Sequence, residues 1–63
     1  MKFLVAASRH GMVVGFASGE FPFYCRREKD ACRFDDERTA VGIAELCQRR
    51  TPSLEWFVRR ING

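Results

Sequence analysis

Three cysteines and one histidine are the side chains of this 63-residue chain best suited to nucleophilic or metal chemistry. Six residues separate Cys25 from Cys32 and fourteen separate Cys32 from Cys47, so no pair has the C-x2-C spacing common in zinc sites. A four-ligand zinc site would need His10, far along the chain, as its fourth member. We therefore predict no metal and no cofactor, and expect three reduced thiols that pack as small apolar groups.

Catalysis by a cysteine–histidine pair is the other chemistry that these side chains permit. Nothing in the spacing supplies a third group that would orient His10, and the chain contains no Walker loop, HExxH or GxSxG motif. We predict a protein that is not an enzyme and has no catalytic residues. Two alternatives stay open: a redox role for Cys25 or Cys32, and a disulfide between these two across a hairpin.

An acidic run at residues 35–37 stands directly before an amphipathic stretch, residues 39–50. Carboxylates in a first helical turn complement the helix dipole, and Asp35 or Asp36 can cap free N–H groups. We therefore interpret the run as a helix start rather than as a metal or catalytic site. Pro52 ends the predicted helix. Its buried stripe consists of residues three and four apart: Ala40, Ile43, Ala44 and Cys47.

Strands are predicted on both sides of this helix. Residues 2–8 and 12–18 are short apolar runs that flank Gly11, which favours a β-hairpin. Pro22 requires that the next strand begin at an edge or a bulge. Further extended segments are predicted at residues 21–26, 31–34 and 54–61. The order β-β-β-α-β predicts a single α+β domain, residues 1–63, in which one helix packs on one face of an antiparallel sheet of three to four strands.

Charge and composition limit the class of protein. The net charge is +3, and nine of the eleven basic residues are arginine, which favours carboxylate, phosphate and aromatic partners. A GC-rich genome is an alternative cause of the arginines. No apolar run reaches the roughly 20 residues that span a bilayer, and the apolar start at residues 3–7 is too short for a signal peptide. We expect a cytoplasmic protein without a membrane partner.

Apolar residues point to both faces of the predicted sheet. In the first strand Phe3 and Val5 oppose Leu4 and Ala6, and the second and last strands repeat this pattern. One helix lined by alanines covers a single face, so we expect an apolar patch for a partner on the other face. A curled sheet with small residues at its surface is the alternative.

The predicted partner-binding residues are the members of this patch and the arginines around it. Trp56 is the expected anchor, because tryptophan and arginine are enriched at interface hot spots. A core tryptophan packed on the helix is the alternative interpretation. The predicted set is Arg26, Arg33, Trp56, Arg59 and Arg60.

Two resemblances imply a binding role. Residues 32–40, CRFDDERTA, and the helix after them resemble the strand-to-helix passage of AP2-like domains, which read DNA with sheet arginines. In overall form, a short arginine-rich chain of this plan resembles small accessory proteins of bacteriophages, such as host-takeover inhibitors and anti-CRISPR proteins.

These resemblances and the two-sided strands lead to two hypotheses. The first is a non-enzymatic protein that docks on a host macromolecule, foremost a protein complex, and acts as an inhibitor in the host cytoplasm. The alternative is a small DNA- or RNA-binding domain that uses sheet arginines. A homodimer is compatible with either, because the sheet has exposed edges.

Overall fold

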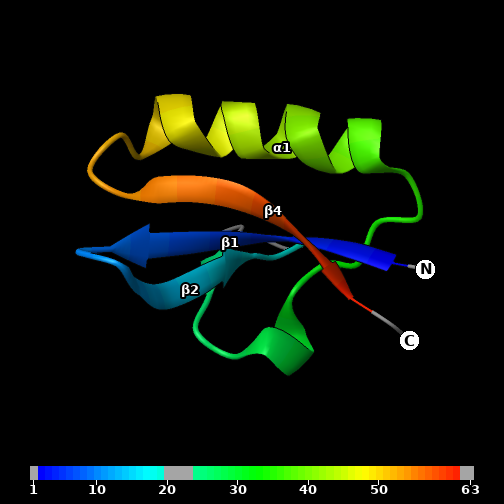
Figure 1. Ribbon diagram of the computed structural model, residues 1–63, viewed down its shortest axis with the longest axis horizontal. Coiled ribbons are helices and arrows are strands. Elements are labelled where there is room, and N and C mark those ends of the chain that lie inside the picture. Colours follow the sequence, from blue (N-terminus) through cyan, green and yellow to red (C-terminus); the bar gives the residue numbers. More distant parts are fainter. Residues whose placement is uncertain (1, 20–23, 62–63) are drawn as a thin grey trace.

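The computed structural model describes residues 2–19 and 24–61. Its elements in chain order are β1 (Lys2–Arg9), β2 (Met12–Ala17), β3 (Tyr24–Cys25), a turn of 3-10 helix η1 (Glu28–Asp30), α1 (Glu37–Arg50) and β4 (Glu55–Ile61). The strands form one antiparallel sheet in the order β3-β2-β1-β4, and α1 packs on one face of it (Figure 1). The predicted α+β fold is confirmed.

The β1–β2 connection is the tight turn that the glycine predicts. His10 and Gly11 have φ angles of 53° and 79°. Two consecutive positive φ angles are the requirement of the type I′ turn that suits the twist of a hairpin. A register shift between Ala7 and Ser8 then marks a bulge in the ladder.

Helix α1 begins at Glu37, two residues before the predicted start. Asp36 is the N-cap: its carboxylate accepts a hydrogen bond of 3.1 Å from the backbone N–H of Thr39. Asp35, the other candidate, forms an ion pair with Lys2 instead. The helix ends at Arg50, and Thr51 donates its N–H to the carbonyl of Cys47 immediately before Pro52.

The third strand is shorter than predicted within the described residues. It comprises Tyr24 and Cys25, paired with Ala17 and Phe16 of β2. Residues 21–23 of the predicted strand lie outside the described residues. Beyond Cys25 the chain leaves the sheet and passes through η1 on the side opposite α1 (Figure 1).

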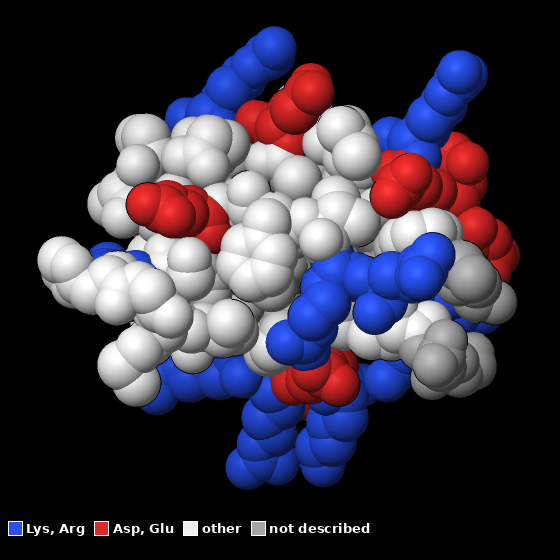
Figure 2. All heavy atoms as spheres, viewed as in Figure 1, with Lys and Arg blue, Asp and Glu red and all other residues white. Residues whose placement is uncertain are grey.

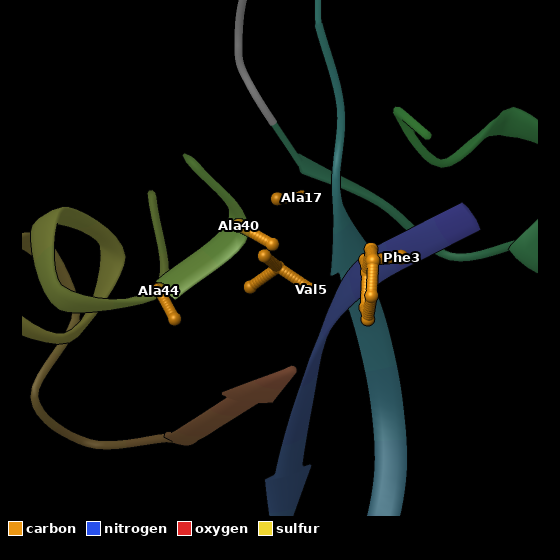
Figure 3. Close-up of a cluster of buried hydrophobic side chains, with 5 residues drawn as sticks. All are labelled: Phe3, Val5, Ala17, Ala40 and Ala44. Carbon is orange, nitrogen blue, oxygen red and sulfur yellow. The ribbon is translucent and has the colours of Figure 1, made fainter. Parts of the chain in front are cut away.

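Two apolar clusters occupy the two faces of the sheet, because successive strand residues point to opposite sides. The cluster between sheet and helix contains Phe3, Val5, Ala17, Ala40 and Ala44 (Figure 3). The cluster on the opposite side, which we call the far face, contains Leu4, Ala6, Phe16 and Ala31. The two-sided pattern of the strands is therefore real, and both faces are packed.

The segment that covers the far face is the part of the fold not foreseen from the strand pattern. Ala31, just after η1, is only 6% exposed. Cys32 donates its N–H to the carbonyl of Ala17 at 3.0 Å, and Phe34 exchanges backbone hydrogen bonds of 2.7 and 2.8 Å with Phe3. The apolar patch expected on the far face is therefore not exposed at Leu4, Ala6 and Phe16, because the segment that carries Ala31 forms a second cover. Phe34, at the end of this segment, packs against the helix-side cluster.

Candidate binding surfaces

Alternation along β4 divides the predicted binding residues between two sides. Trp56 and Val58 pack against the helix-side cluster, whereas Ile61 packs against the far-face cluster. Arg59 pairs with Leu4 and so lies on the far face, while Arg60 pairs with Phe3 and points to the side of α1. Arg26 and Arg33 are exposed in the segment under the far face. The five residues therefore do not share one surface.

Trp56 adopts the core position that was the alternative interpretation. Its indole Nε1 donates to the carbonyl of Thr51 at 3.2 Å. Its ring meets Tyr24 edge to face, with centroids 6.2 Å apart and an angle of 80° between the planes. Because this indole is half-buried and hydrogen-bonded, its main contribution is to the stability of the fold, not to partner binding. Its remaining exposed edge borders a groove described below.

Gln48 fixes the start of β4 against the helix. Its side-chain Nε2 donates to the carbonyl of Leu54 at 2.8 Å, and its Oε1 accepts the backbone N–H of Trp56 at 3.1 Å. The amide is thus a clamp between α1 and β4. Gln48 was not among the residues predicted from the sequence, because a glutamine seven residues before a strand matches no recognisable motif.

Arg59 of β4 connects the sheet to η1, in the segment that covers the far face. Its guanidinium forms an ion pair with Glu28 of η1 and lies 5.6 Å from the ring centroid of Phe16. The Arg59 side chain remains 37% exposed. A cation held over an aromatic ring and paired with a carboxylate is well positioned for a structural role.

The net charge of the chain is concentrated on this side. Residues 26–33 contain four basic and two acidic side chains, and Arg59 adds one positive charge, so the sum is 4 − 2 + 1 = +3, equal to the charge of the whole chain. We call residues 26–33 with Arg59 the basic side. Basic side chains are seen gathered below the sheet, away from α1 (Figure 2). The remaining charges of the sequence cancel.

An apolar groove runs between α1 and β4, which is an outer strand of the sheet. It has a volume of about 360 Å³. White surface fills the middle of this side of the molecule in Figure 2, with an acidic side chain at its left and a basic side chain at its right. We call the groove between α1 and β4 the edge groove. The residues that line it are Val41, Ala44, Glu45, Gln48, Trp56, Phe57 and Val58.

Two of the three cysteines, Cys25 and Cys47, have environments that disfavour the reactive thiolate. All three are free and half-buried. Burial raises the pKa of the Cys47 thiol above its ordinary value, and burial together with the nearby Asp30 raises that of Cys25. Both thiols are therefore protonated at neutral pH, whereas the thiolate is the reactive form. A second groove, of about 240 Å³, is lined by Cys32, Cys47 and Phe34 among others.

Clusters of metal ligands and buried polar side-chain atoms without a partner are absent from the part of the chain that the structure describes. Within residues 2–19 and 24–61, no three potential metal-ligating side chains gather at one point. In this part of the chain every buried side-chain nitrogen or oxygen has a hydrogen-bond partner. No helix formed by the described residues combines the length and the apolar character needed to cross a membrane.

Comparison with known proteins returns no relative: no protein-family profile, curated protein or solved structure matches the chain. The inference of function therefore depends on the two surfaces described above, the basic side and the edge groove.

Proposed function

We propose that this chain is a non-enzymatic binding protein that docks through its basic side on an acidic surface of another protein. The observation that carries the proposal is the position of the charge: the full +3 of the chain belongs to residues 26–33 and Arg59. Charge complementarity of this kind steers association and selects the partner.

The basic side is held in place by the fold. The ion pair between Arg59 and Glu28, the burial of Ala31 and the backbone bond from Cys32 to Ala17 attach the segment to the sheet. Order before binding reduces the entropy lost on association. A cationic segment anchored at three points is therefore a better docking surface than a flexible tail of equal charge.

The exposed arginines of this segment are available for a partner. Arg26 and Arg33 form no ion pair with any described residue. Phe57, on the same face of β4 as Arg59, is 38% exposed. Arginines beside an aromatic ring are the residue types enriched at interface hot spots. Of the set predicted from the sequence, Arg26, Arg33 and Arg59 stay in the proposed surface.

The other two members of that set have different positions. Trp56 is half-buried against the helix-side core, so its loss would act through stability. Arg60 lies on the opposite side of β4 from Arg59, toward α1. We therefore leave both out of the basic side.

Occupation of a partner's surface is also the mode of action of the bacteriophage accessory proteins that the chain resembles in form. We propose the same mode here: the protein inhibits its partner in the cytoplasm by covering an acidic surface, and performs no chemical step. The support for this finer proposal is the resemblance together with the absence of a catalytic motif from the sequence.

A charge-reversal experiment tests the proposal. The double variant Arg26→Glu/Arg33→Glu should lose the partner that wild-type protein retains from nuclease-treated cell extract. The matched control is Arg38→Glu/Arg49→Glu, which changes the net charge equally on exposed positions of α1. Equal loss in both variants would show that net charge, not the basic side, governs retention, and would contradict the proposal.

Binding of nucleic acid is the second candidate, since the same arginines fit phosphate groups. It predicts a complex with a labelled DNA duplex or RNA strand at low salt. Its affinity should fall by about 0.9 log units per log unit of salt for each phosphate contacted. The protein-docking proposal instead predicts no shift of either probe in an electrophoretic assay.

A further inference from the structure

We propose that two copies of this chain pair edge to edge through β4, antiparallel about a two-fold axis at Val58, to form one continuous eight-stranded sheet. The inference concerns β4 and the edge groove, and of the residues of the basic side it involves Arg59 alone. Its occupant is a second copy of the same chain.

The backbone of β4 is available for this pairing. β4 is an outer strand, bonded to β1 along one edge (Figure 1). The N–H of Trp56 donates to Gln48 on α1 and therefore points away from β1. In an antiparallel ladder the direction of the backbone groups alternates, so Val58 and Arg60 also present their N–H and C=O groups outward. No residue that the structure describes bonds to these outward groups of Val58 and Arg60 outside the sheet ladder, so another strand can satisfy them.

The side chains of β4 are complementary to themselves when the strand is reversed. Its first half carries the aromatic residues and its second half the arginines. Pairing about Val58 sets Trp56 opposite the partner's Arg60 on the side of α1. It sets Phe57 opposite the partner's Arg59 on the far face. Arg60 thus faces an aromatic ring of the partner, which is a favourable cation–π arrangement. The Arg59 guanidinium is already held by Glu28 and Phe16 of its own chain, so the pairing of Phe57 with Arg59 adds contact with the stem of that arginine.

Other registers are less favourable. A two-fold axis at Arg59 would set two arginines directly opposite each other, and like charges at that position destabilise a sheet. An axis at Phe57 would leave Arg60 and Ile61 beyond the end of the partner's strand. Val58 is the middle residue of Glu55–Ile61, so an axis there aligns the whole strand. The backbone bonds between the copies would join the two Val58 residues and run from the Arg60 N–H to the partner's Trp56 carbonyl, because Gln48 already accepts the Trp56 N–H.

The edge groove gives the pairing an apolar contact beside the backbone bonds. Val58 lies in the groove and would meet its own copy at the axis, below the helix residues Val41 and Ala44. Val41 is 42% exposed in the single chain. A two-fold axis perpendicular to the sheet brings the second α1 alongside the first on the same face, so it would cover this side chain.

The same symmetry sets the two basic sides together on the far face. This consequence, unlike the dimer, rests on the proposed function. A partner would then meet two cationic segments at once, and simultaneous engagement would raise its apparent affinity. A dimer defect should therefore weaken partner binding without removing it, whereas reversal of Arg26 and Arg33 should remove it.

Sedimentation velocity tests the dimer. Wild-type protein should reach a mass twice the 7.3 kDa of one chain. Arg60→Pro removes one outward N–H and obstructs the edge, yet leaves the β1–β4 ladder intact because that N–H points away from β1. It should be a monomer. Arg60→Lys keeps both the N–H and the cation and should remain a dimer.

A cysteine crosslink tests the register. In a Cys25→Ser/Cys32→Ser/Cys47→Ser background, Val58→Cys should form a covalent dimer on mild oxidation. The paired Cα atoms would be about 5.5 Å apart, within disulfide range. Met12→Cys, at an exposed position on β2, is the control for random collision and should crosslink far more slowly.

Two results would overturn the proposal. Wild-type protein that stays monomeric at millimolar concentration would show that the arginines of β4 keep the edge unpaired. A dimer that survives Arg60→Pro, with no Val58→Cys crosslink, would place the interface elsewhere. If the serine background fails to fold by circular dichroism, the Arg60 series alone decides between these results.

Discussion

Tyr24 shows how one side chain extends the cover of a sheet beyond its helix. Its hydroxyl donates to the carbonyl of Val14 at 3.0 Å, and its ring reaches Trp56. The phenol lies directly over Gly15, where a Cβ would overlap it. Glycine within a strand here marks a close approach of another group. A strand glycine was the one visible signal of this contact in the sequence.

Substitution of Gly15 tests this packing. Gly15→Ala should displace the Tyr24 ring and destabilise the fold by about 1–3 kcal/mol, as overpacking does. The matched control is Gly42→Ala on α1, where an added Cβ meets nothing within 4 Å. Because alanine favours a helix over glycine, the control should stabilise the fold by up to about 1 kcal/mol. Urea denaturation measures both, and equal effects would contradict the contact.

Cys47 should make stability depend on alkaline pH. Burial raises the pKa of its thiol in the folded chain above the value in the unfolded chain. Its contribution to stability is therefore fully present below the unfolded pKa and is lost as pH rises through the folded pKa. The wild type should lose stability relative to Cys47→Ala on going from neutral to alkaline pH in urea titrations. A constant difference would show that the thiol does not titrate in this way.

At the scale of elements, the Gln48 amide makes two of the hydrogen bonds that hold the junction between α1 and β4, beside the bond from the Trp56 indole to Thr51. Thr51 and Pro52 end the helix, and the chain reverses through Leu54, which is buried at 7% exposure. Gln48 then bonds both to Leu54 and to Trp56 across this reversal. The clamp sets where β4 begins and therefore which residues face the edge groove.

Removal of the clamp should cost stability. Gln48→Ala leaves the Leu54 carbonyl and the Trp56 N–H without their partner, so we expect a loss of about 1–2 kcal/mol. Arg49→Ala, on the exposed face of the same helical turn, is the control and should change stability by less than about 0.5 kcal/mol. Thermal unfolding compares the two. A Gln48→Ala variant as stable as the control would mean that water replaces the amide at no cost.

At the scale of the whole molecule, the sheet carries a small apolar cluster on each face. Helix α1 covers one cluster, and the segment with η1 and Ala31 covers the other. Both clusters contain mostly small residues, and Leu4 and Val5 are the largest fully buried side chains among those described. A domain of this size buries little surface, so each cover matters to stability. The cover of the far face is weaker than the cover by α1. It contributes one buried apolar residue, Ala31, to its cluster, whereas α1 contributes Ala40 and Ala44.

Loss of Arg59 should loosen that cover selectively. Arg59→Ala removes the contacts with Glu28 and Phe16, and since the side chain is partly exposed we expect about 1 kcal/mol of destabilisation. Hydrogen exchange at the Cys32 N–H should accelerate more than exchange within α1. Arg60→Ala, whose side chain points toward α1, should leave the Cys32 amide protected. Uniform acceleration across the chain would contradict a local role.

Local interactions made much of this fold readable from the sequence. Gly11 in a two-residue turn, an aspartate before a helix and Pro52 after it each act within a few residues, so the elements and their order were predictable. The choice between Asp35 and Asp36 was not predictable, because either side chain can cap a first turn; in the structure Asp36 accepts from Thr39 and Asp35 pairs with the distant Lys2.

Contacts between segments far apart in the chain decided the rest. Pairing of β4 with β1 turned Trp56 to the helix and Arg59 to the far face, which separated residues that sequence alone had grouped. Passage of residues 26–31 across the far face brought Glu28 to Arg59 and placed the basic side opposite α1. Neither result follows from the local sequence pattern. The register of β4 on β1 and the path of the segment after β3 are both set by the packing of the two apolar faces of the sheet.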